Sequence, residues 1–261
     1  MSENVPESVA DSLETDSSLL PYMPFLLQDL WALGTDVESI IRAIDSLGLT
    51  SSSQLNVLDL GCGKGALSIR IAMRFGYRVF GIDAMAPFIE DAIDKSRQHN
   101  VFHLCTFKQQ DIFQFLKTGP QFDMVIFASL GGLLGTFQET VRKLRQQVRD
   151  GGYIFIDDGY LKKGDRLNRK GYAHYRNHDK TVEELTCYGD RLIDEISTAE
   201  ATERINKDYL QIIRKRGKEL VKLKPELKST IESYIALQVE ECRIIEEETE
   251  GALWVIRKEG K

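Results

Sequence analysis

The stretch VLDLGCGKGALSIRIA, which begins at Val57, constrains the fold more than any other part of the chain. An apolar run ends at Leu60, glycines follow at positions 61, 63 and 65, and a helical apolar pattern then begins. Glycines at the end of a buried strand let the main chain turn tightly and approach a ligand without a Cβ in the way. The next helix turns its N–H groups and positive dipole end toward the same place. The stretch therefore predicts an α/β fold with a ligand site where its first strand ends.

The composition limits the class of partner and the compartment. The 261 residues are 42% hydrophobic and 28% charged, which is typical of a globular protein, and the net charge of −6 disfavours a nucleic-acid partner. Cysteines stand at 62, 105, 187 and 242 without a C-x-x-C pair, as expected for reduced thiols. No apolar run reaches the roughly 20 residues of a membrane span. The acidic N-terminus does not resemble a signal peptide. We expect a cytoplasmic protein with no membrane partner and a flexible tail over residues 1–18.

Strands and helices alternate through the middle of the chain. Apolar runs predict strands at 55–60, 78–83, 104–111, 122–127 and 153–157, and the intervening periodicity predicts helices at 65–75, 87–99, 112–117 and 136–148. This order indicates a parallel sheet covered on both faces. Two helices are expected within residues 19–49. A largely helical region is expected over 181–241, followed by a hairpin of 243–248 with 252–258.

Four interpretations of the glycine-rich loop remain open. A phosphate-binding P-loop needs Ser or Thr after its lysine, but Gly65 follows Lys64. A dinucleotide fold needs G-x-G-x-x-G, which the spacing of the three glycines matches poorly. The glycines could also serve only to turn a loop. The fourth interpretation is a site for S-adenosylmethionine.

Asp59-x-Gly61-x-Gly63-x-Gly65, with Asp83 closing the next strand, resembles motif I of the class I S-adenosylmethionine-dependent methyltransferases of the small-molecule type. The resemblance implies a Rossmann-like, mostly parallel seven-stranded sheet whose last strand is antiparallel and lies beside the fifth. It also implies N-terminal helices and a helical insertion after strand 5. Residues 19–261 would then form one methyltransferase domain, with residues 160–241 as a helical lid.

The same resemblance assigns cofactor contacts position by position. It implies that the backbone at Gly61, Cys62 and Gly63 cradles the methionine part and that Asp59 holds its amino group. Asp83 would accept hydrogen bonds from the ribose hydroxyls. The remaining implied contacts are Ala84 and Met85 beside the adenosine, Asp111 and Ile112 at the adenine, and Ala128 near the methionine part. Met85 could equally be a core residue, and Asp111 could simply cap a helix. Tyr22 is either a cofactor or lid contact or a packing residue.

The expected methyl acceptor is a small molecule, methylated at an N, O or C atom. Methyltransferases of exocyclic base amines commonly carry an Asn/Asp-Pro-Pro-aromatic motif after the fourth strand, and residues 127–132 read FASLGG instead. One alternative is an RNA or protein methyltransferase that uses the basic run 214–218. Another is a non-catalytic module that only binds S-adenosylmethionine.

Catalytic candidates follow the fifth strand. Methyl transfer needs a base only when the nucleophile carries a proton that must leave. The candidates are Tyr160, His174, Tyr175 and Asp158. A histidine could serve as a base or be an ordinary loop residue, and an acid after the strand could hold a cationic amine, bind a metal or cap a turn. His174 and His178 have helical ligand spacing without an evident third ligand, so no metal site is expected.

Overall fold

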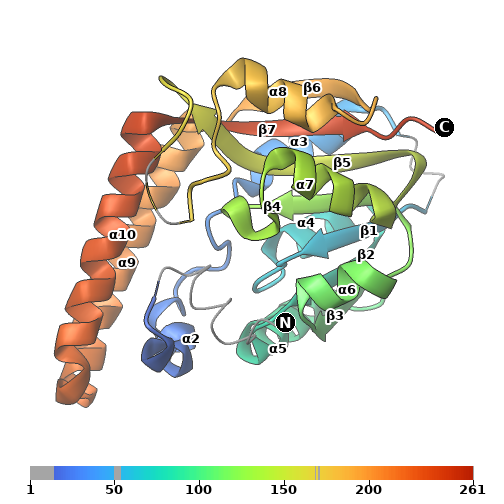
Figure 1. Cartoon of the computed structure of the whole chain (residues 1–261). Coiled ribbons are helices and arrows are strands. Elements are labelled where there is room, and N and C mark those ends of the chain that lie inside the picture. The colour runs from blue at the N-terminus through green and yellow to red at the C-terminus, as the bar shows by residue number, and fades with distance from the viewer. Residues whose placement is uncertain (1–14, 50–53, 168, 170, 261) are drawn as a thin grey trace.

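The computed structural model describes residues 15–49, 54–167, 169 and 171–260. One seven-stranded sheet organises them, in the order β3-β2-β1-β4-β5-β7-β6 (Figure 1). The pairs from β3 to β5 are parallel, whereas β7 lies antiparallel between β5 and β6. The strands are β1 Asn56–Leu60, β2 Arg78–Asp83, β3 Cys105–Gln109, β4 Phe122–Ala128, β5 Val148–Leu161, β6 Arg191–Ser197 and β7 Thr249–Arg257. The predicted Rossmann-like sheet is confirmed, including an antiparallel last strand beside the fifth.

Helices cover both faces of this sheet. The α-helices are α2 Met23–Leu26, α3 Val37–Ser46, α4 Ala66–Phe75, α5 Ala86–Gln98, α6 Ile112–Thr118, α7 Phe137–Leu144, α8 His178–Thr186, α9 Ala199–Leu223 and α10 Lys228–Glu248. Short 3-10 turns are η1 Ser17–Tyr22, η2 Gly131–Leu134, η3 Arg145–Gln147 and η4 Pro225–Leu227. One apolar layer packs α3, α4 and α5 on the sheet, and the other packs α6, α7 and α8.

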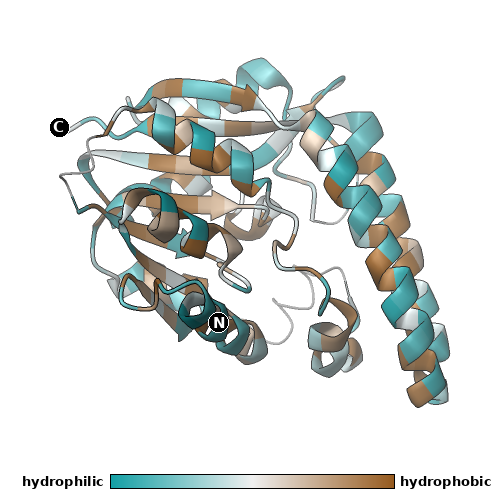
Figure 2. Ribbon diagram, turned by 180° about the vertical axis from the view of Figure 1, so that it is seen from behind, coloured by the Kyte–Doolittle hydropathy of each residue, from teal (hydrophilic) through white to brown (hydrophobic). Residues whose placement is uncertain are grey.

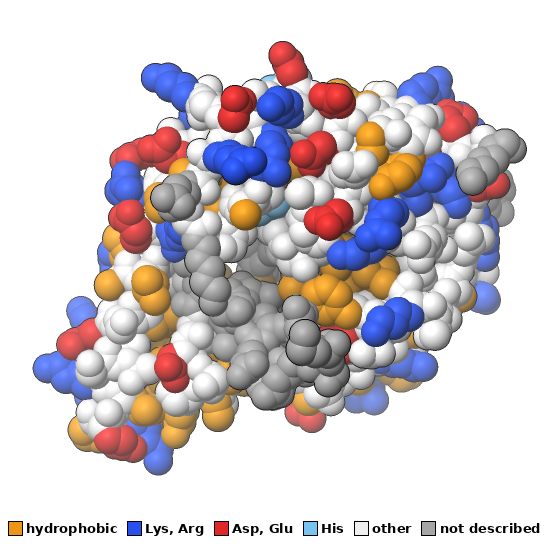
Figure 3. Space-filling model, viewed as in Figure 1, with side chains coloured by type: hydrophobic (Ala, Val, Ile, Leu, Met, Phe, Trp, Pro, Cys, Tyr) orange, Lys and Arg blue, Asp and Glu red, His pale blue; other side chains and the backbone are white. Residues whose placement is uncertain are grey.

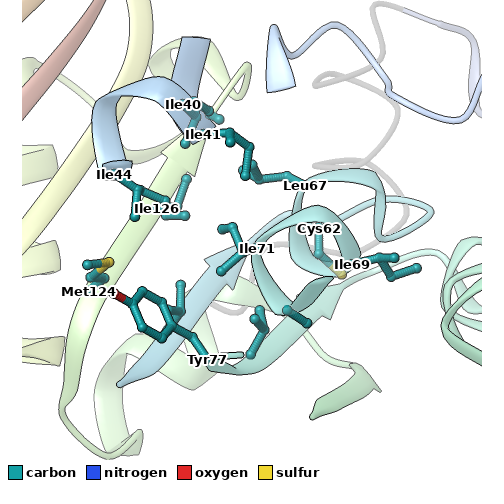
Figure 4. Packing of buried hydrophobic residues seen from close by; sticks show 14 of the residues in the cluster. Ile40, Ile41, Ile44, Cys62, Leu67, Ile69, Ile71, Tyr77, Met124 and Ile126 are labelled. Atoms are coloured by element: carbon teal, nitrogen blue, oxygen red, sulfur yellow. The ribbon is translucent and has the colours of Figure 1, made fainter. Parts of the chain in front are cut away.

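Strand alternation explains the two layers. Side chains of successive residues point to opposite faces, so Ile126 joins the layer of α3 and α4 while Phe127 joins the other. Figure 4 shows Ile40, Ile44 and Ile71 packed around Ile126 in the first layer. Strands apolar on both faces appear brown in Figure 2. Their parallel arrangement brings the carboxyl ends of β1, β2, β4 and β5 to one edge.

Two predictions for the C-terminal third are wrong. Residues 191–197 form the strand β6, where a helix was expected, and residues 243–248 continue α10, where a strand was expected. Strand β6 is half exposed, so its hydrophobic period is weak. Arg243 pairs with Glu240 and Glu247, which is the i,i+3 and i,i+4 spacing of a helix. Strand β7 therefore pairs with β5 and β6 instead of forming a local hairpin.

The helical insertion lies between β6 and β7, one strand later than expected. Helices α9 and α10 form an antiparallel pair that runs beyond the sheet on one side of the molecule (Figure 1). Ile213, Leu220, Ile231 and Tyr234 are buried between them and α2. The pairing is close because Gly217 faces Ile231 and Ile235, where a Cβ would lie 2.9 Å from either side chain.

The two helices expected within residues 19–49 are present as α2 and α3, but the first is shorter than its apolar pattern predicts. Helix α2 ends at Leu26, and residues 27–36, which we call the strap, cross the carboxyl edge of the sheet without forming a helix. Most of the expected tail, residues 1–14, lies outside the described residues, but Leu19 is already fully buried. None of the described helices is long and apolar enough to cross a membrane.

Candidate active site

The glycine-rich loop turns directly after β1. Gly61, Gly63 and Gly65 have φ angles of +67°, +50° and +73°, a region that side chains of L-residues disfavour. A Cβ on Gly65 would lie 2.9 Å from the Cβ of Ala92, and one on Gly61 would lie 2.6 Å from Leu130 Cδ2. Both backbone angle and close packing therefore require glycine here. The loop ends at the first residue of α4.

Asp83 fixes this loop from the end of β2. Its two carboxylate oxygens accept hydrogen bonds from the backbone N–H of Gly63 at 2.9 Å and of Met85 at 2.8 Å. Burial raises the pKa of Asp83, and these backbone donors oppose the rise. A carboxylate offers about four lone-pair directions, so Asp83 can accept further hydrogen bonds from a ligand.

Asp59 is the other acid of the motif, and it is 3% exposed. Ser68 of α4 donates a 2.5 Å hydrogen bond to its Oδ2. Burial raises the pKa of Asp59 to about 7, and the negative charge of Asp83 adds to the rise. A cationic group placed beside Asp59 would restore the ionised carboxylate.

A cavity of about 30 Å³ opens over the loop. Five of the predicted cofactor residues line it together: Asp59, Gly61, Cys62, Gly63 and Ala128. The strap contributes Trp31 and Leu33 to the opposite wall. A larger cavity of about 380 Å³ lies at the other edge of the sheet, where Lys258 already donates to the carbonyls of Arg145 and Val148.

Lys64 ties the strap to the loop. Its side chain is 1% exposed, its Nζ donates to Leu27 O at 2.7 Å, and it lies 3.6 Å from Asp91. Trp31 Nε1 in turn donates to Lys64 O at 3.0 Å, and its ring stacks on His99. The ammonium group is buried and occupied, which rules out the P-loop interpretation.

The remaining predicted cofactor residues follow β2 and β3. Gln109 Nε2 donates to Ala84 O at 3.1 Å, which links these two strand ends. Asp111 caps α6 by accepting from Gln114 N at 2.8 Å, and Ile112 is buried behind it. The capping role that the sequence left open for Asp111 is therefore present.

Tyr22 and Met85 lie between the sheet and the insertion. Both are half-buried and pack against the apolar cluster that joins α2 to α9 and α10. The packing interpretation of each residue is thus supported by the structure.

Three of the four catalytic candidates meet beyond the end of β4. His174 Nε2 lies 3.2 Å from Asp158 Oδ2, and both side chains are at least 95% buried. Tyr175 packs beside His174 and bonds with the same carboxylate; burial, followed by the charge of Asp158, raises its pKa well above the usual range. Tyr160 is separate, because its ring packs on His178, which pairs with Glu195.

Asp157 points to the opposite face of β5 from Asp158. Ser129, at a φ of +55°, donates to its carboxylate at 3.4 Å, and Thr35 of the strap donates to Ser129 Oγ at 3.2 Å. Burial raises the pKa of Asp157 to about 8, and the negative charges of Asp158 and Asp36 add to the rise. Asp157 thus lies near the acids Asp158 of β5 and Asp36 of the strap.

A family model described as a methyltransferase domain matches residues 51–217, which span β1 to α9. The chain belongs to this methyltransferase domain family. The match includes the glycine-rich loop, Asp83 and the cluster around His174.

Curated relatives match only a part of the chain. A ubiquinone biosynthesis O-methyltransferase of Rickettsia akari is 28% identical over 120 residues, covering 46% of each chain. A malonyl-[acyl-carrier protein] O-methyltransferase of Acetivibrio thermocellus is 33% identical over 127 residues, covering 45% of this chain and 41% of the relative. The matched part spans less than half the length of either relative.

Solved structures of the family share the fold over most of the chain. A SAM-dependent methyltransferase from Thiobacillus denitrificans, solved with S-adenosyl-L-homocysteine, superposes with a TM-score of 0.74 at 15% identity, covering 90% of this chain and 97% of its own. A Geobacter sulfurreducens methyltransferase superposes with the same TM-score, 0.74, at 15% identity, covering 89% and 96%. These likenesses cover more of the chain than the residues 51–217 that the family model matches.

Sequence reasoning missed the residues that support this family site. Trp31 lies within the region 19–49 that was expected only to form two helices, and Lys64 was considered only as a phosphate ligand. Ser68, which bonds Asp59, lies nine positions away, one turn into α4. A hydroxyl in the first turn after the glycines was the signal that could have identified it. No local signal marks Trp31, because its partners come from α5 and the loop.

Proposed function

We propose that this protein transfers a methyl group from S-adenosylmethionine to a small-molecule acceptor. The observation that carries the proposal is the clamp of Asp83 on the glycine-rich loop, with Asp59 and Ala128 at the same cavity. Membership of a methyltransferase family and the O-methyltransferase relatives support the same reaction.

The residues of the site fit this cofactor. The loop offers main chain without side chains at Gly61 and Gly63 to the amino-acid part. Asp59 offers a buried carboxylate to the ammonium group, and Asp83 offers free lone pairs to the ribose hydroxyls. Ala84, Met85, Asp111 and Ile112 stand at the neighbouring strand ends, where the adenosine would lie. When bound, the cofactor supplies an electrophilic methyl group on a sulfonium.

Binding requires a small opening of the site. The cavity of about 30 Å³ is far below the roughly 300–1,000 Å³ of small-molecule pockets. Leu130 lies against Gly61 and Leu33 against Gly63. Both side chains must move apart for the amino-acid part to reach the backbone. We propose that the strap serves as a lid that opens and then closes again over the cofactor.

Ion pairs within the basic run 214–218 favour a small acceptor over RNA. Arg216 pairs with Asp29 of the strap and with Glu219, and Lys215 also pairs with Asp29. Positive and negative groups are interspersed over the face seen in Figure 3. An RNA site would need cations free to contact phosphates, with binding that weakens steeply as salt rises.

Residues 19–261 are proposed to act as one methyltransferase domain, in which the α9–α10 pair and the segment of His174 cover the acceptor. A cytoplasmic location accords with the free cysteines 62, 105, 187 and 242.

Calorimetry with S-adenosylhomocysteine tests the cofactor site, and a methyl-transfer assay on phenols, amines, carboxylates and tRNA tests the acceptor. We expect one cofactor molecule per chain and transfer to a small acceptor. Absence of cofactor binding by folded protein would refute the proposal. Tight cofactor binding with no transfer would support the non-catalytic module, and transfer to tRNA alone would support the nucleic-acid alternative.

A further inference from the structure

His174 is held in one orientation by groups from three elements. Its Nε2 faces Asp158 Oδ2 of β5 at 3.2 Å. Its ring packs edge-on against Phe137 of α7, with ring centroids 5.6 Å apart, and lies beside Tyr175 at 4.2 Å. Because an ionised carboxylate can only accept, Nε2 carries the proton in this pair. The other ring nitrogen, Nδ1, is then the one with a free lone pair.

Nδ1 of His174 has no hydrogen-bond partner among the described residues, although the residue is 95% buried. A buried polar atom without a partner is uncommon and calls for an explanation. Nδ1 faces Gly132, where a Cβ would lie 2.5 Å from this nitrogen. The glycine therefore lets the basic nitrogen lie directly against the backbone that follows β4.

The segment 129–135 connects this nitrogen with the cofactor loop. Leu130 contacts Gly61, and Gly132, two residues later, contacts His174. Ser129, Gly131 and Gly135 have positive φ angles, so the segment is a sharply turned loop. It forms a shared wall between the cofactor loop and the imidazole. An acceptor that displaces this wall would meet both.

We propose that His174 is the base that takes a proton from the methyl acceptor, that Asp158 positions it, and that the acceptor atom is a neutral hydroxyl oxygen. This inference rests on the proposed methyl transfer. His174 Nδ1 removes the hydroxyl proton while an oxygen electron pair forms the new O–CH3 bond. The carbon–sulfur bond breaks, and its electron pair stays on sulfur as a neutral thioether. The positive charge passes to the imidazolium, which Asp158 stabilises.

The surroundings favour a neutral hydroxyl over a carboxylate as the acceptor. A carboxylate acceptor needs no base and would be repelled by the carboxylate of Asp158, which faces His174. A neutral hydroxyl needs a base because its oxygen is a weak nucleophile while protonated. The acceptor class is therefore a phenol or comparable hydroxyl compound.

The test compares two phenols of similar size but different acidity, 4-methoxyphenol and 4-nitrophenol. At mildly alkaline pH the first is protonated, whereas the second is largely ionised and needs no base. We expect His174→Gln to lower kcat/KM for 4-methoxyphenol by about 10²-fold or more, the usual range for a lost general base. For 4-nitrophenol the loss should stay below about tenfold.

Two further variants complete the experiment. Asp158→Asn should lower kcat/KM more for 4-methoxyphenol than for 4-nitrophenol, as His174→Gln does, but by a smaller factor. If His174→Gln no longer binds S-adenosylhomocysteine, the result for Asp158→Asn is used in its place. His178→Gln is the matched control, because it removes a histidine that also pairs with a carboxylate, Glu195, four residues along the same segment. This control should leave both phenols unaffected.

Equal losses on both phenols in His174→Gln and Asp158→Asn would mean a merely structural role and overturn the inference. It would also fall if the wild-type protein binds S-adenosylhomocysteine but methylates neither phenol, which leaves the proposed cofactor use intact. Failure of the wild-type protein to bind S-adenosylhomocysteine would instead refute the proposed function.

Discussion

The two halves of the carboxyl edge of this sheet are built from different material. Around β1 and β2, backbone N–H groups and glycines shape the surface, and the one carboxylate of Asp83 holds them in place. Around β5, buried side chains form the surface instead, because Asp158, His174 and Tyr175 meet in a cluster. A backbone site suits a ligand common to a whole family, whereas a side-chain site can change its chemistry by substitution. We therefore propose that the first half binds the cofactor and the second half binds the acceptor.

Gly61→Ala should have the largest effect on the cofactor half. We expect affinity for S-adenosylhomocysteine to fall at least about 100-fold, because the new Cβ occupies the surface on which the ligand must lie. Gly76→Ala is the matched control, since Gly76 has a similar φ of +70° but open space around it. Gly76→Ala should lose about 1–2 kcal/mol of stability from backbone strain, and Gly61→Ala should lose more, because its Cβ would also lie 2.6 Å from Leu130 Cδ2. Calorimetry that shows equal affinity for the two variants would contradict a backbone-built site.

Asp83→Asn should weaken cofactor binding about 10- to 100-fold, as judged by calorimetry. An amide has a single carbonyl oxygen and cannot accept from both Gly63 and Met85, so the loop loses one of its two fixed points. Asp111→Asn is the control, because asparagine caps a helix as well as aspartate does. If Asp111→Asn lost more affinity for S-adenosylhomocysteine than Asp83→Asn, the main ligand contact would be at the end of β3 and not at the end of β2.

Asp157→Asn tests the acidic half through the pH dependence of stability. The folded pKa of Asp157, about 8, lies above the usual aspartate value of 3.8. The folded protein therefore keeps a proton that the unfolded chain releases, and this group's stabilisation is lost as pH rises from about 4 to about 8. The variant has no such loss, so its stability relative to wild type should rise by about 4 kcal/mol between pH 5 and pH 8, at about 1.4 kcal/mol per pH unit. Thermal unfolding at pH 5 and pH 8 measures the difference; a constant difference would place Asp157 in a solvated site.

Lys64→Met should have the smallest effect, since it removes the hydrogen bond from Nζ to Leu27 O and the ion pair with the half-exposed Asp91 but retains the apolar stem. The strap should open about tenfold more often, which corresponds to about 1.4 kcal/mol. Limited proteolysis within residues 27–36 and the dissociation rate of S-adenosylhomocysteine report this opening. Lys95→Met, at the exposed end of the same region near the Trp31 ring, is the control. Equal proteolysis of both variants would show that Lys64 does not hold the strap.

The same contrast explains what could be predicted from the sequence. The cofactor half depends on local spacing, so β1, β2 and the glycine-rich loop were predicted nearly residue by residue. Strand β6 and the register of β7 depend on pairing between segments some 60 residues apart, which no local period encodes. Asp158 and His174 could be named as candidates, but their 3.2 Å contact forms only in the tertiary structure, because they lie 16 positions apart in the sequence. The strap was missed because Trp31 and Lys64 meet only through tertiary structure.

A crystal structure of the wild-type protein with S-adenosylhomocysteine tests the central claim most directly. We predict the ribose hydroxyls on the carboxylate of Asp83, the amino-acid part over Gly61 and Gly63, and Leu33 and Leu130 displaced from the glycines. The sulfur should point toward the segment 129–135. The account would be contradicted if the ligand were bound at another edge of the sheet. It would also be contradicted if the ligand lay beside Asp83 without contacting the glycine-rich loop.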